Sequence, residues 1–383
     1  MEYRRLGRTG LLVSEIGFGC EWLEHATRET VQEVVDRATE LGINIMDCWM
    51  SDPTVRSNLG DAIEGDRDRW YVQGHIGSTW SGGQYVRTRD VEKCKVAFDD
   101  LLERFHTDHM DLGMMHYIDS PAEFEQAMGG AYAACVPDLR RTAPIRYGGM
   151  STHNPITGTM AIESGDVDML LFSVNPAYDM KPASEDIETL FGDYGDEANA
   201  MDPDRMELYR LAEANDVGIT VMKCFAGSRL LDPDRSPFGV ALTPAQCIHY
   251  ALTRPAVASV LLGYRSLADL EEDAAYETAT PEERDYATAL ATAPEHPVSG
   301  LCTYCGHCAP CTVGIDIAQV NKFYDLAEVQ VSKGHELPEL VRDHYRALGV
   351  TADACVGCGA CEPRCPFGVP IVERMAQSAR LFG

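Results

Sequence analysis

Basic residues are scarce in this chain. Its 383 residues include 32 Lys and Arg against 60 Asp and Glu, which gives a formal net charge of −28 at pH 7. Proteins that bind nucleic acid need a basic stripe to meet the phosphates, and anionic membranes attract the same kind of charge. The composition therefore argues against nucleic acid and membrane surfaces as partners. It leaves solubility, or pairing with a basic partner or a cationic substrate, to explain the acidity.

Two other features are missing. No apolar run reaches the roughly 18 residues of a membrane span. No G-x-G-x-x-G follows an early strand, which counts against a doubly wound dinucleotide-binding sheet. By contrast, 45% of the residues are apolar and 24% are charged, which is typical of globular proteins. The chain can therefore bury a large core.

Short apolar strands alternate with amphipathic stretches between about residues 12 and 290. Apolar residues recur every three to four positions in Thr30–Leu41, Asp90–Phe105, Arg205–Asn215 and Pro244–Leu252, which predicts helices. Eight strands with intervening helices favour a (β/α)8 TIM barrel over an open α/β sheet. The predicted strands are Glu15–Gly19, Asn44–Trp49, Tyr71–Ile76, Met110–His116, Tyr147–Thr152, Met169–Asn175, Gly218–Cys224 and Ser259–Tyr264.

The domain boundaries follow from composition. The predicted barrel occupies residues 1–291, a linker with Pro, Gly and Ser follows at 292–300, and a small Cys-rich domain occupies 301–383. Within the barrel region, Met1–Gly10 is expected to form a small hairpin. The long acidic segment Pro176–Asp202 is expected to be a lid on the active-site face or a solvated loop.

The chain has 14 cysteines, of which eight lie in two tight runs near the C-terminus. A chain of this size needs no disulfide staples, so we expect a reducing cytoplasm and metal ligation by the clustered set. Single cysteines with apolar neighbours are usually small buried hydrophobes. They are Cys20, Cys48, Cys94, Cys135, Cys224 and Cys247.

The second run has the C-x2-C-x2-C-x3-C-P spacing of bacterial ferredoxins, in which the fourth cysteine ligates the other [4Fe–4S] cluster. The first run departs from it, with two residues before its last cysteine and Thr312 in place of proline. Ile317–Glu328 and Glu336–Leu348 have helical patterns, which favours an α-helical ferredoxin-like domain. Two structural zinc sites are the alternative. By analogy, one cluster is assigned to Cys302, Cys305, Cys308 and Cys365, and the other to Cys311, Cys355, Cys358 and Cys361.

Polar residues follow most of the predicted strands, where the catalytic groups of barrels gather. Seven stretches of this region resemble the aldo/keto reductase family. They are YRRLGRTGLLVSEIGFG (3–19), ELGINIMD (40–47), GDRDRWYVQGH (65–75), DLGMMH (111–116), GGMSTHN (148–154), VGITVMKCFAG (217–227) and VASVLLGYRSLADLEED (257–273). One branch of that family carries a similar double ferredoxin-like tail, so the resemblance covers nearly the whole chain.

The family reduces carbonyls with NAD(P)H through an Asp, Tyr, Lys and His tetrad. The resemblance places its Asp on Asp47 and its His on His116, but Asp52 stands where the Tyr is expected and His75 where the Lys is expected. His75 is a candidate proton donor among these four candidate catalytic residues. Two histidines and a carboxylate are also a possible divalent-metal site, and a binding pocket without catalysis is a third interpretation.

The resemblance also implies a cofactor site. The family contacts the nicotinamide with Ser and Asn after strand five, where this chain has Ser151 and Thr152. At the end of strand eight, Gly263, Arg265 and Ser266 resemble the motif with which the family binds the cofactor phosphates. The helix that starts there suits an anion. The remaining candidates are Asn175, Lys223 and Arg229. The resemblance implies NAD(P)H as the cofactor. FMN is the other candidate, because a flavin can exchange both a hydride and single electrons and could therefore connect the barrel site to iron–sulfur clusters.

These observations predict an iron–sulfur oxidoreductase that acts on a small carbonyl or activated unsaturated compound and moves electrons through two [4Fe–4S] clusters. A ferredoxin or another electron-transfer protein is a possible partner. The alternatives are an NAD(P)H-dependent carbonyl reductase with structural clusters, and a non-catalytic cofactor-sensing or electron-transfer subunit. The sequence leaves the substrate, the direction of electron flow and the oligomeric state open.

Overall fold

Eight parallel strands close into a barrel in the computed structural model, which describes residues 1–142, 145–192, 194 and 200–383. The strands follow one another around the barrel in chain order, and β12 closes against β3. All eight predicted strands are confirmed, with ends that differ by up to two residues. They are β3 (Ile16–Gly19), β4 (Ile45–Cys48), β5 (Tyr71–Ile76), β8 (Met110–Met115), β9 (Ile145–Thr152), β10 (Met169–Ser173), β11 (Gly218–Met222) and β12 (Val257–Gly263).

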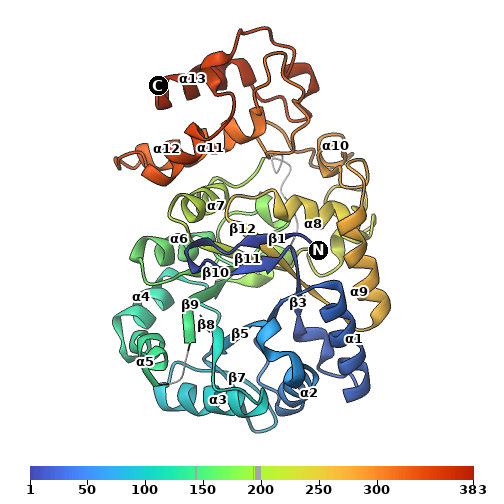
Figure 1. Cartoon of the computed structure of the whole chain (residues 1–383), viewed down its shortest axis with the longest axis vertical. Coiled ribbons are helices and arrows are strands. Elements are labelled where there is room, and N and C mark those ends of the chain that lie inside the picture. Colours follow the sequence, from blue (N-terminus) through green and yellow to red (C-terminus); the bar gives the residue numbers. More distant parts are fainter. Residues whose placement is uncertain (143–144, 193, 195–199) are drawn as a thin grey trace.

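Helices cover the outside of the barrel, as their apolar periodicity predicts (Figure 1). Several start at a side chain that accepts a hydrogen bond from the first-turn amides, such as Thr27 before α1 and Thr243 before α8. Among the described residues, no helix is both long enough and apolar enough to cross a bilayer. The barrel-domain helices are α1 (Arg28–Leu41), α2 (Pro53–Ile63), α3 (Val91–Arg104), α4 (Pro121–Gly129), α5 (Cys135–Thr142), α6 (Pro155–Ser164), α7 (Pro203–Ala214), α8 (Pro244–Leu252), α9 (Leu267–Ala274) and α10 (Tyr286–Ala291).

A hairpin closes the end of the barrel where the strands begin. Its strands β1 (Tyr3–Arg5) and β2 (Leu12–Ser14) extend beyond the predicted Met1–Gly10. Leu6 and Val13 are fully buried and pack on the inward-facing apolar residues of the barrel strands. The hairpin therefore plugs the bottom of the barrel and leaves only the opposite end open for chemistry.

A second hairpin, which the sequence analysis missed, stands at the open end. It consists of β6 (Ser78–Ser81) and β7 (Gln84–Arg87), joined at Gly82 and Gly83, which both have positive φ angles. It follows β5 directly, so it brings extra side chains to the edge of the barrel mouth.

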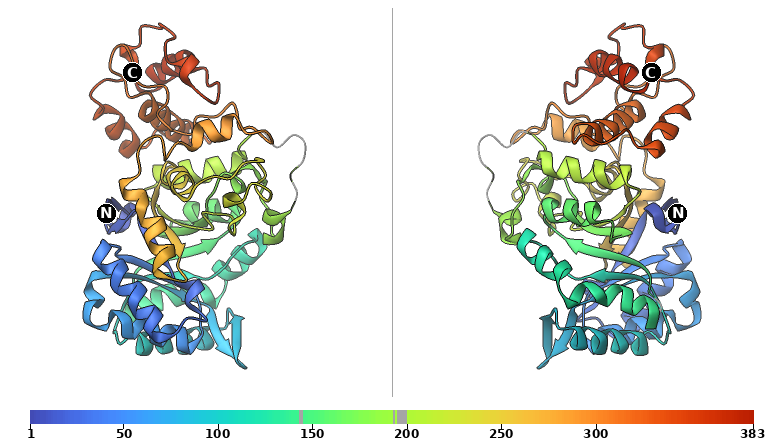
Figure 2. Two further views of the ribbon diagram at one scale, coloured as in Figure 1. Left: turned by 90° about the vertical axis from the view of Figure 1, so that its right-hand side faces the viewer. Right: turned by 90° about the vertical axis from the view of Figure 1, so that its left-hand side faces the viewer.

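The tail contains three helices, α11 (Ile317–Val331), α12 (Glu339–Arg346) and α13 (Ile371–Phe382), and it packs on the side of the barrel through α11. Helix α11 lies along α7, and the tail and the β6–β7 hairpin stand at opposite ends of the long axis (Figures 1 and 2). The two predicted helices of the tail are confirmed as α11 and α12.

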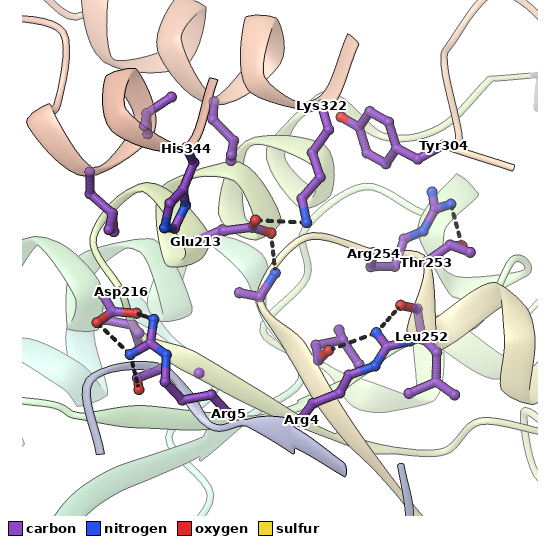
Figure 3. Close-up of a pocket in the computed structure, with 18 of the residues that line it drawn as sticks. Arg4, Arg5, Glu213, Asp216, Leu252, Thr253, Arg254, Tyr304, Lys322 and His344 are labelled. Atoms are coloured by element: carbon purple, nitrogen blue, oxygen red, sulfur yellow. Dashed lines mark hydrogen bonds and ion pairs between the residues drawn. The ribbon is translucent and has the colours of Figure 1, made fainter. Parts of the chain in front are cut away.

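Ion pairs and buried hydrogen bonds hold the tail in place. Lys322 on α11 contacts Glu213 on α7 at 2.7 Å, and the buried Arg254 guanidinium donates to the Thr303 carbonyl oxygen at 2.5 Å. A cavity of about 430 Å³ lies beside these contacts, between the bottom of the barrel and α11 and α12 (Figure 3). Arg5 and Asp216 form a further ion pair at its edge (Figure 3). The tail therefore contacts the flank and bottom of the barrel.

Candidate functional site

Three predicted catalytic side chains meet at the ends of β4, β5 and β8. Asp47 Oδ1 lies 2.8 Å from His75 Nε2, and His75 Nδ1 lies 2.8 Å from His116 Nδ1. All three residues are buried, with 5%, 2% and 4% of their surface exposed. Because the strands are parallel and neighbours in the barrel, their carboxyl ends place these groups side by side.

Two polar side chains inside the barrel fix the carboxylate. Gln73 Nε2 donates to Asp47 Oδ1 at 2.9 Å, and Thr220 Oγ1 donates to Gln73 Oε1 at 3.0 Å. Both are completely buried. The orientation of Asp47, and through it of the His75 ring, is therefore set by a hydrogen-bond network that spans the barrel interior.

A tyrosine from the β6–β7 hairpin extends the row. The Tyr85 hydroxyl lies 2.7 Å from His116 Nε2, on the side of the ring away from His75. The Trp49 ring stacks on His116 with centroids 5.9 Å apart, and the Tyr85 ring meets Trp49 edge-on at 5.3 Å. Tyr85 is 37% exposed, so the row Asp47–His75–His116–Tyr85 runs from the barrel interior to its mouth.

Burial decides the charge states in this row. It lowers the pKa of His116 well below the usual value, and the nearby His75, Arg89 and Arg87 lower it further. Burial also raises the pKa of Tyr85, against the opposing charges of Arg87 and Arg89. At neutral pH, His116 is therefore an uncharged imidazole and Tyr85 a protonated phenol. Such a row can pass a proton between the interior and the mouth.

The structure does not bring Asp52 into this row. Its carboxylate accepts hydrogen bonds from the Thr54 and Val55 amides at 2.7 and 3.1 Å and caps the start of α2.

The possible metal-binding residues Asp47, His75 and His116 form a line in which both ring nitrogens of His75 face other side chains. Throughout the described parts of the chain, no three His, Cys, Asp or Glu side chains converge as a mononuclear metal site requires.

Three of the expected cofactor-binding side chains, at the ends of β9 and β10, bond to neighbouring loops after β8 and β11. The Tyr117 amide donates to Ser151 Oγ at 2.8 Å, and Thr152 Oγ1 donates to Asp119 at 3.0 Å. Asn175 is fully buried and donates to the Lys223 carbonyl oxygen at 2.8 Å. These side chains shape the mouth, and any direct contact with a cofactor stays a prediction.

The expected phosphate-binding side chains are more open. Lys223 is partly exposed and lies 3.8 Å from Glu21, while Arg265 is mostly exposed and pairs with Asp269. Ser266 caps α9, so the first amides of that helix point towards the same area. Trp22 lies against Gly263, where an added Cβ would come within 2.0 Å of the indole ring.

Two further predictions concern the loop after β10. Arg229 donates to the Phe191 carbonyl oxygen at 2.7 Å, so it supports this loop. Asp179, expected in a lid or solvated loop, is fully buried and accepts from the Tyr209 and Tyr250 hydroxyls at 2.5 and 2.6 Å. The other acidic residues of the predicted loop include Asp193, Asp196 and Glu197, which lie outside the described residues.

The cysteine runs fold around two separate cavities in the tail. The fourth cysteine of each run crosses to the cavity of the other, as the predicted assignment requires. Four thiols around one cavity suit a cubane cluster, because each supplies one iron with a sulfur ligand. Cys302, Cys305, Cys308 and Cys365 line one cavity, and Cys311, Cys355, Cys358 and Cys361 line the other.

Sequence reasoning missed Tyr85, Trp49 and Gln73. A signal for Tyr85 was present, because two glycines between the runs STWS and QYVR are typical of a two-residue hairpin. The spacing of family motifs offered no such signal, since the hairpin lies in a connection between strands.

Two family models match the chain. The aldo/keto reductase family matches residues 15–241, and the 4Fe-4S binding domain matches residues 349–371. Among curated proteins, the uncharacterized oxidoreductase YqkF of Bacillus subtilis is 29% identical over 159 residues, 40% of this chain and 50% of that protein. The uncharacterized oxidoreductase YrpG of the same organism is 28% identical over 147 residues, 33% and 43% of the two chains. The chain thus spans about half the length of these curated relatives.

Solved structures support the barrel. An aldo-keto reductase from Bacillus halodurans in its holo form aligns with a TM-score of 0.58 and 21% identity, over 78% of this chain and 98% of that one. A putative aldo-keto reductase from Pseudomonas aeruginosa aligns with a TM-score of 0.56 and 20% identity, over 72% and 93%. At this identity the likeness concerns the fold.

Proposed function

Because this chain belongs to the aldo/keto reductase family and carries a 4Fe-4S binding domain, we propose that it is an oxidoreductase for a small organic substrate at the barrel mouth. We propose that it reduces or oxidises a carbonyl or an activated unsaturated bond and exchanges the electrons through two [4Fe–4S] clusters. The observation that carries the proposal is the row Asp47–His75–His116–Tyr85. It supplies the acid–base function that the family assigns to its tyrosine and lysine.

The row has two hydrogen-bond polarities. In one, the Tyr85 hydroxyl donates to His116 Nε2, His116 Nδ1–H donates to His75 Nδ1, and His75 Nε2–H donates to Asp47. When His75 carries one more proton, on Nδ1, it still donates from Nε2 to Asp47. The bonds between Tyr85 and His116 and between His116 and His75 then reverse their direction. Then His116 Nε2–H donates to the Tyr85 oxygen and frees the phenol proton for the substrate.

Proton delivery converts the second polarity into the first. The phenol proton goes to the substrate oxygen or carbon, the His116 Nε2 proton goes to Tyr85, and the His75 Nδ1 proton goes to His116. The row loses one proton in total, and no charge is left on Tyr85. The reverse sequence serves oxidation. Because His116 stays neutral by burial, it passes the proton without holding it.

The order of elements around the barrel suits the proposed coupling. The proton row lies on β4, β5 and β8, and the tail contacts α7, which precedes β11, and Arg254, which precedes β12. The open side chains Lys223, Arg265 and Ser266, which would hold the phosphate of a nicotinamide or flavin cofactor, lie at the mouth ends of β11 and β12, the two strands whose other ends border the cavity beneath the tail. When bound, such a cofactor supplies hydride chemistry, and two clusters supply two single electrons.

The proposal favours an enzyme over a cofactor sensor, because a sensor has no need of a phenol in contact with a histidine at the mouth. We also propose that the protein acts in the cytoplasm, that its cofactor is NAD(P)H or FMN, and that an electron-carrier protein is its partner. The net charge of −28 disfavours nucleic acid and anionic membrane lipids, which we propose are not partners.

The test starts with protein purified without oxygen. Iron, sulfide and flavin are quantified, and NADH, NADPH and dithionite are then tried as reductants of the visible cluster absorption. We expect about eight irons per chain and reoxidation that depends on an added carbonyl or enone. Clusters that no substrate reoxidises, together with NAD(P)H-dependent turnover, would instead identify a simple carbonyl reductase with structural clusters. Tight cofactor binding without turnover would identify a sensor.

A further inference from the structure

The two cysteine cavities of the tail differ in their distance from solvent. The inner cavity, lined by Cys302, Cys305, Cys308 and Cys365, lies against the barrel. Next to it, Tyr286 on α10 and Arg254 both donate to the Thr303 carbonyl oxygen. The outer cavity, lined by Cys311, Cys355, Cys358 and Cys361, includes the only exposed ligand cysteine among the eight, Cys358.

The loop over the outer cavity carries almost no side-chain bulk. Its sequence from Val356 to Ala360 is VGCGA, and both glycines have positive φ angles. A Cβ added at Gly359 would meet nothing within 4 Å, so this side of the loop is open. Val356 is 67% exposed, so an apolar side chain stands in solvent beside the loop. The exposed Cys358 therefore lies among small and apolar residues, with no bulky side chain in its loop.

Three exposed carboxylates lie close in sequence to residues that line the outer cavity. Asp316 lies between Ile315 and Ile317, Glu373 follows Val372, and Asp353 lies two residues before Cys355. The one cation in the lining, Arg364, donates its hydrogen bonds to the Cys308 and Pro310 carbonyl oxygens. Three carboxylates against this one guanidinium give the surroundings of the outer cavity a net negative charge, and a charged rim of this kind can guide a partner that packs against an apolar centre.

We propose that this patch, which we call the outer-cavity face and define by Val356–Ala360 with Asp316, Asp353 and Glu373, is the docking surface for a small one-electron carrier protein with a basic face. The inference rests on the proposed electron transfer and adds to it which cavity faces the partner and which charge the partner carries. The basic face follows from charge complementarity, because an acidic carrier would meet three carboxylates here and a chain of net charge −28 beyond them.

The test uses the full-length oxidised holoprotein and cytochrome c as the probe, since cytochrome c is a basic one-electron carrier. A zero-length carbodiimide joins its lysines to carboxylates of this chain, and mass spectrometry locates the links. Calorimetry at physiological ionic strength measures the affinity. Neither readout needs turnover, so a failure at the barrel mouth leaves the result of this test unchanged.

Two pairs of variants separate the face from the general acidity of the chain. Asp353→Asn with Glu373→Gln removes two charges at the rim, and Glu64→Gln with Asp68→Asn removes two exposed charges on the barrel. Likewise Val356→Arg is matched by Val96→Arg, since these valines are 67% and 70% exposed. We expect links at the rim carboxylates and an affinity lower by about three- to tenfold in the tail variants only.

Either of two results would overturn the inference. One is links confined to barrel carboxylates, with equal weakening by the barrel and tail variants. The other is tighter binding of an acidic ferredoxin than of cytochrome c, which would show that the partner carries the opposite charge. Iron content is measured for every variant, so that loss of a cluster is not mistaken for loss of docking.

Discussion

Removing one oxygen atom tests the proton row. In the Tyr85→Phe variant, the hydroxyl 2.7 Å from His116 Nε2 disappears, and the phenyl ring keeps its edge-on contact with Trp49. We expect the chemical step of substrate reduction to slow by about 10²- to 10⁴-fold, the usual contribution of a positioned general acid. This corresponds to a barrier higher by about 3 to 5 kcal/mol.

The fold should survive this change. Tyr85 is 37% exposed, and the backbone of β7 pairs with β6 whichever side chain is present. Because His116 is buried, loss of its hydrogen bond to Tyr85 costs about 1 to 3 kcal/mol. The matched control is Tyr3→Phe, which removes the hydrogen bond from an exposed hairpin tyrosine to the Gly42 carbonyl oxygen on the opposite side of the barrel.

The assay is single-turnover oxidation of pre-reduced protein by substrate in a stopped-flow instrument without oxygen, followed by urea unfolding of both variants. A Tyr85→Phe rate within about threefold of the Tyr3→Phe rate would refute the assignment of Tyr85 as the acid, because no general-acid effect is that small. An equally slow His116→Asn variant is expected, since it interrupts the supply of protons to Tyr85.

Three further predictions concern stability and metal content. The Asp179→Asn variant leaves the buried Arg205 without its anion and should lower the free energy of unfolding by about 3 to 5 kcal/mol in urea titrations. Burial, with nearby Arg284, Arg4 and Arg254, lowers the pKa of His249 to about 4. Since the unfolded chain takes up that proton near pH 6.5, stability should fall by about 3 kcal/mol between pH 6.5 and 4, and His249→Gln should remove this fall. Cys358→Ala should halve the iron content, from about eight to about four atoms per chain, in a colorimetric assay.

The barrel could be predicted from the sequence because its signals are local. Most strands are short apolar runs that end near a polar residue, and stretches with helical apolar periodicity separate them. That Asp47, His75 and His116 lie together could be predicted for the same reason, since strand ends in a closed barrel share one edge. Which cysteines line each cavity could also be predicted, because the C-x2-C-x2-C-x3-C-P spacing is typical of ferredoxins whose fourth cysteine crosses to the other cluster.

The functions of Asp52 and Asn175 were not predictable in the same way. An aspartate followed by Pro53 is also the pattern of a helix start, and the structure uses Asp52 as that cap. Asn175 follows a strand as a ligand-binding residue would, yet its side chain closes the loop through Lys223 and Tyr178. Spacing places a side chain at the mouth, but its partners depend on loops whose shape is set by tertiary contacts.

The place where the tail attaches has an evolutionary consequence. Glu213 on α7 and Arg254 after α8 anchor the tail to the flank and bottom of the barrel, while the β6–β7 hairpin stands at the other end of the molecule (Figure 2). Selection can therefore reshape the mouth loops for a new substrate without loosening the tail. In a barrel of this design, the substrate site at one end can diversify while the attachment of the cysteine-rich tail at the other end stays constant.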